Sequence, residues 1–434
     1  MALSPILIHS DLPDDDPNRV DNFSNLPDEL IISILSLLCT RDAVRTSLLA
    51  RRFGHLWESS PSINIFSSQS DKFVAMADHA LLQRNLTKSL LSLRLSFTSN
   101  SNESLPVSLI SSCLIKARNL NLRHLIIHDF TLMLEPILPI IFSINSLESL
   151  DIPSYRLDHD KEYSLPAATM LTCLRSLRFL VFKINSAKLN RLLSELCCLE
   201  DLHLEMMMEH DVSLSSHTIR KLKVTTSRTI YLGLYIPTLE LLHYESSRVP
   251  CFRGEIPSLR EVVFIFDYVG EKDINARSGL LKYISHAEKL TLEINEDTEE
   301  MYPFPLMLEP GKVAPMFSGL KHLDVTACFH DFNLEAVVIL LHHSPALESV
   351  RLVHKPPASF TFGANKRKKK DWASKLPRNA DGNRCYAYFT NLHSDENSEE
   401  FMKLLNKKFT PERKRMKPQS RKCTFLKNRG LLEE

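Results

Sequence analysis

Histidine and cysteine are the side chains here best suited to metal binding or nucleophilic chemistry, and the chain has 17 and 9 of them. One group lies late in the chain, where Cys328 and His330 precede His342 and His343. Two imidazoles on one helix face need a spacing of four residues, which the adjacent His342 and His343 lack, and no HExxH motif surrounds them. No CxxC pair occurs, so we expect reduced thiols and no metal site.

Motifs for cofactor binding and covalent catalysis are also missing from the sequence. None of the ten glycines lies in a GxGxxG or GxxxxGK context that could cradle a phosphate. No GxSxG marks a serine nucleophile. The sequence therefore predicts a non-catalytic protein without a cofactor.

The basic residues are concentrated at the C-terminal end. Residues 355–434 hold 20 Lys and Arg against 9 Asp and Glu, which leaves 33 against 43 for the rest of the chain. One run consists of Lys366, Arg367, Lys368, Lys369 and Lys370. Such a run is typical of a nuclear import signal, of a nucleic-acid contact or of a solvated tail. No nucleic-acid-binding fold signature accompanies it, so nucleic acid is the least favoured partner.

Length and composition indicate a folded chain with more than one unit. The 434 residues are 44% hydrophobic and 24% charged, enough for a large core. No apolar run is long enough to span a membrane, and the start "MALSPILIHSDLPDDD" lacks the features of a secretory signal. We expect a soluble intracellular protein of the nucleus and/or cytoplasm that does not bind membranes.

A leucine pattern repeats through the middle of the chain. An apolar residue is followed three and five positions later by two more, as in "LLSLRL", "LEDLHL" and "LKHLDV". The steps between units mostly lie near the 20 to 29 residues of leucine-rich repeats, and three successive steps are equal. The units begin at Leu90, Leu122, Leu147, Leu174, Leu199, Ile219, Leu239, Leu259, Ala287, Leu320 and Leu347.

The spacing within each unit predicts a strand. In an extended segment alternate side chains share a face, so the last two apolar residues enter a core and the residue between them faces out. The segment Ala187–Leu204 also carries leucines at helical spacing before its strand, so each unit is interpreted as helix, turn and strand. Such units must stack, and we predict an α/β solenoid over residues 75–355 with a parallel sheet on its concave face.

One region of this predicted concave face is apolar instead of polar. Leu241, Val263 and Ile265 occupy outward positions, with Tyr244 beside them in the sheet. Exposed apolar residues on neighbouring strands suggest a substrate-binding patch. Two alternatives remain open: the C-terminal segment covers these residues, or the register slips by one and they belong to the core.

The front segment Asn25–Trp57 has a different pattern, with apolar residues at helical spacing. Pro27 suits a helix start, and Thr40 is expected to cap a second helix before a third short one. So small a bundle buries little surface by itself, so it either caps the solenoid or offers apolar residues to a partner. The residues expected on that surface are Leu26, Pro27, Leu30, Ile34, Leu35, Val44, Leu48 and Trp57.

This front segment resembles an F-box. Its LP-x-E-L start, its "DAV" and its final Leu56–Trp57 match the usual pattern, whereas Cys39, Ala50 and Phe53 replace the usual proline, serine and tryptophan. An F-box followed by leucine-rich repeats is similar to a large plant family, some of whose members add an FBD-type domain. Residues 317–352 resemble the core of that domain.

The resemblance implies a domain order and a function. Residues 1–21 would be a disordered N-terminus, 22–60 the F-box, 75–355 the repeats with FBD-like last units, and 356–434 a basic, partly disordered region. The F-box would dock on the SKP-family adaptor of an SCF-type cullin–RING ubiquitin ligase, and the repeats would hold an unknown protein substrate. The alternatives are a repeat scaffold capped by its front helices, and a nucleic-acid-associated protein acting through its basic tail.

Overall fold

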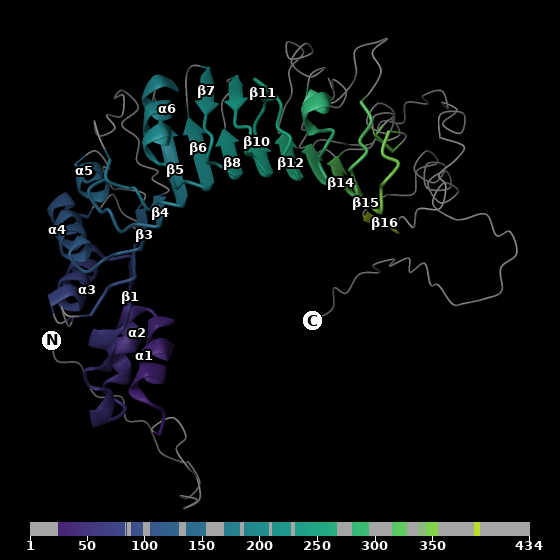
Figure 1. Ribbon diagram of the computed structural model, residues 1–434. Helices are drawn as coiled ribbons and strands as arrows, with labels where there is room; N and C mark the ends of the chain where they lie inside the picture. Colours follow the sequence, from purple (N-terminus) through teal and green to yellow (C-terminus); the bar gives the residue numbers. More distant parts are fainter. Residues whose placement is uncertain are drawn as a thin grey trace, which may run out of the picture.

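The computed structural model shows an arc with a small helical unit at its N-terminal end (Figure 1). It describes residues 25–82, 84, 88–98, 105–129, 136–152, 169–182, 186–207, 211–226, 231–266, 280–294, 315–327, 337, 340–341, 343–354 and 386–390. No helix among these residues is long and apolar enough to cross a membrane.

The front unit contains two α-helices and two 3-10 turns: α1 (Asp28–Ser36), α2 (Thr40–Thr46), η1 (Arg51–Phe53) and η2 (Leu56–Ser59). Pro27 precedes α1, and Asp28 and Glu29 lie in its first turn, where the helix dipole favours acidic side chains. The prediction that Thr40 caps the second helix is wrong, because Cys39 occupies the capping position. The expected third helix is also replaced by the two 3-10 turns.

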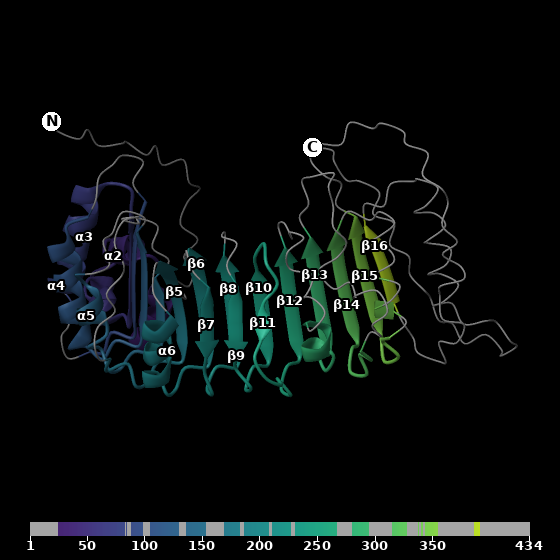
Figure 2. The same cartoon turned by 90° about the horizontal axis from the view of Figure 1, so that it is seen from above.

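A parallel sheet of 13 strands forms the concave side of the arc (Figures 1 and 2). The strand of every predicted repeat is present, in sequence order along the sheet. The sheet begins at Ser62, before the expected residue 75, and ends with a strand in the region expected to be a tail. Its strands are β1 (Ser62–Ser67), β2 (Ser92–Phe97), β3 (His124–Asp129), β4 (Ser149–Ile152), β5 (Ser176–Phe182), β6 (Asp201–Met207), β8 (Lys221–Thr226), β10 (Leu241–Glu245), β12 (Glu261–Phe266), β13 (Lys289–Ile294), β14 (His322–Ala327), β15 (Ser349–His354) and β16 (Tyr386–Thr390).

The convex side changes along the arc. It holds α3 (Ser70–Leu82), α4 (Val107–Arg118), α5 (Leu138–Ile141) and α6 (Ser186–Glu195), and then a parallel sheet of β7 (Val212–Ser215), β9 (Leu232–Tyr235) and β11 (Cys251–Phe252). The prediction of a helix in every unit is therefore wrong for the three equal, shortest units. Those units are too short for a helix and its turns, so a short strand returns the chain instead.

The change of convex element accounts for the change in curvature. Packed helices lie about 8–10 Å apart, whereas neighbouring strands lie about 4.8 Å apart. Helices on one side and strands on the other therefore wedge the repeats apart on the convex side. Where β7, β9 and β11 face β6, β8, β10 and β12, the spacings match and the arc runs straighter (Figure 1).

The core lies between the concave sheet and the convex layer. The first apolar residue of every predicted unit is buried, as are the inward residues of the strands, such as Leu202 and Leu204 on β6. The outward residues between them are partly or fully exposed, as in the alternating burial of β8 and β12. The predicted fold, a helical front unit and a solenoid with a concave parallel sheet, is confirmed.

Residues of alternating charge form a row along the edge of the sheet where the N-terminal ends of its strands lie. The residue just before each strand from β3 to β15 is in turn basic and acidic, and each backbone N–H in this row donates to the carbonyl of its neighbour, as from Glu148 to Arg123. Arg175 and Glu200 lie 2.9 Å apart, and Lys321 and Glu288 lie 3.1 Å apart. Exposed pairs contribute little individually, but the alternation avoids like charges side by side.

Candidate functional site

The front unit has a small core of its own. Ile31, Leu35, Ala43, Phe53 and Trp57 are buried together. The expectation that Leu35 and Trp57 face a partner is corrected by this burial, because both side chains are needed to hold the unit together. Phe53 fills the position where the F-box pattern usually has tryptophan, and it is buried as well.

An ion pair closes the front unit from its last turn to its first helix. Arg52 on η1 donates from Nε and Nη2 to one carboxylate oxygen of Asp28, at 3.0 and 2.6 Å. Its Nη2 also donates to the carbonyl of Leu26. This pairing fixes where α1 begins, and so which side chains of α1 point outward.

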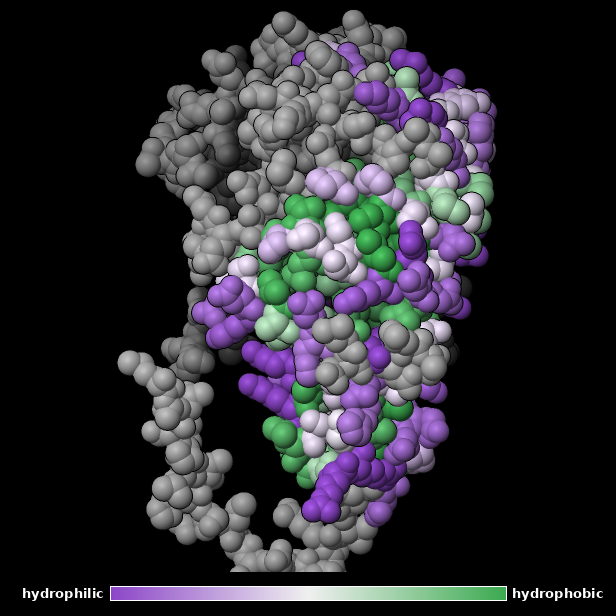
Figure 3. Space-filling model, turned by 90° about the vertical axis from the view of Figure 1, so that its left-hand side faces the viewer, coloured by the Kyte–Doolittle hydropathy of each residue, from purple (hydrophilic) through white to green (hydrophobic). Residues whose placement is uncertain are grey.

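Several other apolar residues of the front unit face solvent. Leu48 and Leu49, just after α2, are 84% and 72% exposed, and Leu37 at the end of α1 is 84% exposed. Figure 3 views this end of the arc, and in its lower part hydrophobic residues lie beside strongly hydrophilic ones. The whole exposed set, called the F-box apolar surface below, is Leu30, Ile34, Leu37, Leu38, Leu48 and Leu49.

The predicted surface overlaps this observed set in part. Leu30, Ile34, Leu48 and Pro27 are exposed, whereas Leu26 and Val44 are half-buried. Leu37, Leu38 and Leu49 were not predicted, although the sequence places them next to α1 and α2. Because helical spacing alone does not show which stripe is covered, these residues could be assigned only from the packing.

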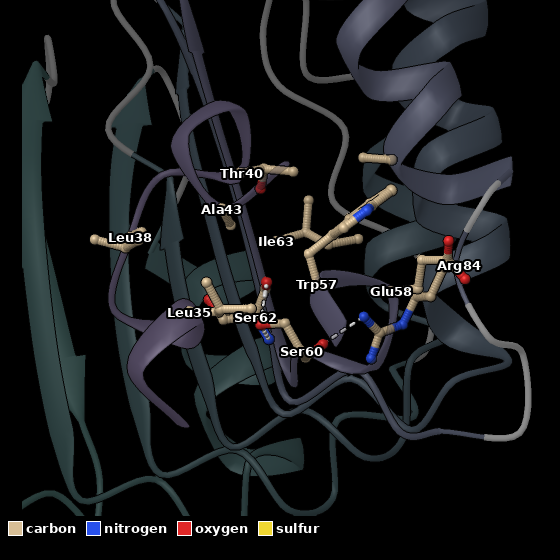
Figure 4. Close-up of a pocket in the computed structure, with 11 residues that line it drawn as sticks. Leu35, Leu38, Thr40, Ala43, Trp57, Glu58, Ser60, Ser62, Ile63 and Arg84 are labelled. Carbon is tan, nitrogen blue, oxygen red and sulfur yellow. Dashed lines mark hydrogen bonds between the residues drawn. The ribbon is translucent and has the colours of Figure 1, made fainter. Parts of the chain in front are cut away.

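The front unit also packs on the first repeat. The backbone N–H of Asn64 on β1 donates to Oγ1 of Thr40 at 2.8 Å. The buried Arg84 donates to the carbonyl oxygens of Ser60 and Ser89. Trp57 stacks on His79 of α3, with ring centroids 5.9 Å apart. The side chains around Trp57, Ile63 and Arg84 leave only about 10 Å³ between them, so this contact is closed (Figure 4).

Polar side chains form a continuous row on the concave face. Asp151, Arg178, His203, Lys223 and His243 lie in register on neighbouring strands from β4 to β10. Arg178 donates to Glu205 at 2.7 and 3.2 Å and lies 3.8 Å from Asp151. Lys223 forms no ion pair with any residue that the structure describes, so it is available to an acidic group.

Burial and the neighbouring lysine keep both histidines of this row neutral. Burial, Lys223 and Arg178 lower the pKa of His203 to about 4. Burial and Lys223 also lower the pKa of His243. At neutral pH each imidazole can therefore both donate and accept a hydrogen bond.

The predicted apolar patch has the expected orientation. Leu241, Val263 and Ile265 are half-buried on the concave face, so the register does not slip. The prediction that Tyr244 belongs to the substrate-binding patch is wrong, because this side chain is fully buried. Its ring meets those of Phe264 and Phe266 edge-on, with 6.3 and 6.5 Å between centroids. Tyr244 supports the patch from within the core and cannot contact a substrate directly.

Other predicted features lie wholly or partly outside the described residues. The basic run Lys366–Lys370 is one, and so are Cys328, His330 and His342 of the group considered for metal binding. Among the residues that are described, no three His, Cys, Asp or Glu side chains come together as metal ligands. The sequence did not predict the pairing of Arg178 or the position of His243, although both lie between the apolar residues of their repeats.

Comparisons with known proteins agree with this architecture. The F-box domain family matches residues 23–64. An F-box/FBD/LRR-repeat protein of Arabidopsis thaliana is 26% identical over 358 residues, 77% of this chain and 75% of the relative. Another is 24% identical over 363 residues, 76% and 77% of the two chains. An F-box/LRR-repeat protein of the same plant is 25% identical over 293 residues, 64% and 61% of the two chains. The chain thus carries an F-box domain and is, over most of its length, a homologue of plant F-box/FBD/LRR-repeat proteins.

Proposed function

We propose that this protein is the substrate-recognition subunit of an SCF-type cullin–RING ubiquitin ligase. The F-box docks on a SKP-family adaptor, which links it to the cullin and RING subunits, and the repeats hold the protein to be ubiquitinated. The F-box domain and the repeat-containing homologues support a substrate-adaptor role in general. Such a subunit makes and breaks no bonds itself; it raises the effective concentration of substrate lysines near a conjugating enzyme.

The F-box apolar surface is the observation that carries this proposal. Six large apolar residues are exposed within one small unit that has already filled its own core. Several exposed large apolar residues gathered in one small unit are typical of a protein interface and cost solubility if nothing covers them. An adaptor that covers Leu30, Ile34 and Leu48 would remove this surface from water.

The junction between the F-box and the solenoid supports the second part of the proposal. Contacts through Thr40, Trp57 and Arg84 attach the F-box to the first repeat. An adaptor on the F-box and a substrate on the concave face would then be held at a set distance and orientation. Substrate binding itself is assigned to the polar row and the apolar patch on that face.

The alternative of a capped scaffold has one observation in its favour. The F-box does cover the first repeat, as a cap would, but this contact leaves the F-box apolar surface exposed. We prefer the adaptor-binding role for that reason. The nuclear and/or cytoplasmic location, and any nucleic-acid contact of the basic run, remain predictions from the sequence.

Adaptor binding by purified variants tests the proposal. We expect Leu30→Ser combined with Leu48→Ser to weaken binding of a SKP-family adaptor by about 30-fold or more, because such anchors contribute about 1 to 2 kcal/mol each. The matched control is Ile115→Ser, which removes an exposed apolar residue from α4 on the convex side. Circular dichroism checks that both variants stay folded. Equal adaptor binding by the double variant and the control would refute the F-box role.

A further inference from the structure

A groove of about 380 Å³ lies between the F-box and the first repeat. Its walls come from α2 of the F-box and from β1 and α3 of the solenoid. Sites for small molecules usually have volumes of about 300–1,000 Å³ and largely apolar walls with a few polar groups. The groove has that size, and its lining residues belong neither to the F-box apolar surface nor to the polar row or the apolar patch.

The walls of the groove are mainly apolar. Val44, Ile65, Phe66, Met76 and Ala80 line it. Phe66 is 60% exposed, the highest exposure of any large apolar residue that the structure describes outside the F-box. An exposed aromatic ring beside a flexible methionine suits a flat apolar molecule, which would gain by removing both from water.

The open edge of β1, the strand that lines the groove, carries backbone polar groups. β1 is the outer strand of the sheet, so every second residue directs its N–H and C=O to the open edge. The N–H of Ser62 donates to Oγ of Ser60, and the same hydroxyl donates to the carbonyl of Ser62. The N–H of Asn64 donates to Oγ1 of Thr40. The next residue of this set is Phe66, whose edge-directed N–H and C=O have no hydrogen-bond partner among the described residues.

The rim of the groove carries an excess of positive charge. Arg41 and Arg45 on α2 share one carboxylate, Asp42, at 3.7 and 3.2 Å, and both guanidinium groups are mostly exposed. His79 also lines the groove. Two fixed cations against one anion favour a ligand with a negative group, since guanidinium pairs well with planar and tetrahedral oxyanions.

We propose that the groove binds a small amphipathic molecule whose flat apolar body lies against Phe66 and Met76 and whose anionic oxygen group meets Arg41 and Arg45. Such a ligand touches the F-box through α2 and the solenoid through β1 and α3, so it ties the two parts together. The site stands on its own geometry and does not depend on the ligase role.

Two matched fluorescent probes test the site on the intact chain. The first is 1-anilinonaphthalene-8-sulfonate, which has a flat apolar body and an anionic group, and the second is N-phenyl-1-naphthylamine, the same body without the sulfonate. We expect saturable binding of both, with the sulfonate tighter. Arg41→Gln combined with Arg45→Gln should weaken the sulfonate by about tenfold while leaving the uncharged probe unchanged.

Apolar variants locate the binding. Phe66→Ser and Met76→Ser should each weaken both probes, by about tenfold for Phe66. Met170→Ser, which removes an equally accessible apolar side chain elsewhere, should weaken neither. Because Phe66 is mostly exposed, Phe66→Ser should leave thermal unfolding nearly unchanged, whereas replacement of Met76, which packs partly against the core, should lower the melting temperature slightly.

Three results would overturn the proposal. The probes could bind without any effect of Phe66→Ser or Met76→Ser. Leu48→Ser could instead abolish binding of the probes, which would place them on the F-box apolar surface. A purified SKP-family adaptor could also expel them from the intact chain, which would assign the groove to the protein interface.

Discussion

At the scale of single residues, the concave face is defined by which charges are paired. Arg178 is neutralised by Glu205 and Asp151, whereas the neighbouring Lys223 has no ion-pair partner among the described residues. The partial burial of His203 and His243, together with the positive charge of Lys223, holds both imidazoles in their neutral form. Within the polar row from Asp151 to His243, Lys223 therefore lies between two imidazoles as a cation that has no ion pair with the described residues.

The pH dependence of stability follows from His203. Its pKa of about 4 in the folded protein lies below the ordinary 6.5, so the unfolded chain binds more protons between these values. The free energy of unfolding should therefore fall as the pH drops from about 6.5 to about 4, and the histidine should have no effect above that window. His203→Gln should make this fall shallower in denaturant unfolding measured across the window.

A second histidine variant is the control for this prediction. His124→Gln changes an exposed imidazole on β3 outside the polar row. It should leave the slope of stability against pH close to that of the original protein. If His203→Gln and His124→Gln gave the same slope, His203 would not be held neutral in the folded state.

At the level of single elements, the alternation of side chains along each strand separates a buried face from the concave face that meets solvent. On β12, Val262, Phe264 and Phe266 are fully buried, while Val263 and Ile265 are half-exposed among polar neighbours. The alternating charges just before the strands also depend on how the repeats are paired. If one repeat were skipped in the stacking, residues of like charge would become neighbours. The convex element depends instead on the length of each repeat.

Substitutions within β12 separate binding from stability. Val263→Ser combined with Ile265→Ser should abolish substrate capture, measured by proximity labelling with and without proteasome inhibition, and should barely lower the melting temperature. Phe264→Ser should destabilise by about 3 to 5 kcal/mol, because it empties a fully buried site. A large loss of stability in the double variant would show that the patch is core, and the substrate surface would then have to be sought along the polar row.

Across the whole molecule, the F-box covers the open edge of the solenoid's sheet in addition to presenting its own apolar surface. The outer edge of a sheet exposes unpaired backbone groups, which invite association with other chains. The hydroxyl of Ser60 bonds to the N–H and C=O of Ser62, and the hydroxyl of Thr40 accepts from the N–H of Asn64. In a solenoid each repeat contacts only its neighbours, so this capping acts mainly on the first repeats.

The removal of one hydroxyl tests the capping. Thr40→Val keeps the shape of the side chain but leaves the N–H of Asn64 without its acceptor, which costs about 1 to 3 kcal/mol locally. Hydrogen–deuterium exchange should become faster in β1 and stay unchanged in β13, far along the arc. Faster exchange throughout the sheet would show that the arc unfolds as one unit.

The order of the elements along the chain and the direction in which each strand faces could be predicted from the amino-acid sequence alone. The spacing of leucines placed every predicted repeat strand, because alternation in an extended chain and burial of apolar residues leave only one register. The F-box pattern was equally local, since its core residues lie within one short segment. The Leu-x-Leu triplets predicted which concave residues face outward.

The contacts between segments that are distant in the sequence could be known only from the packing of the folded chain. Packing buried Leu35, Trp57 and Tyr244, and left Leu37 and Leu49 in solvent. It chose strands over helices behind the shortest repeats, and it formed the groove at Phe66 from α2, β1 and α3. Burial, pairing and cavities depend on residues far apart in the chain, and a local pattern carries no information about which of them meet.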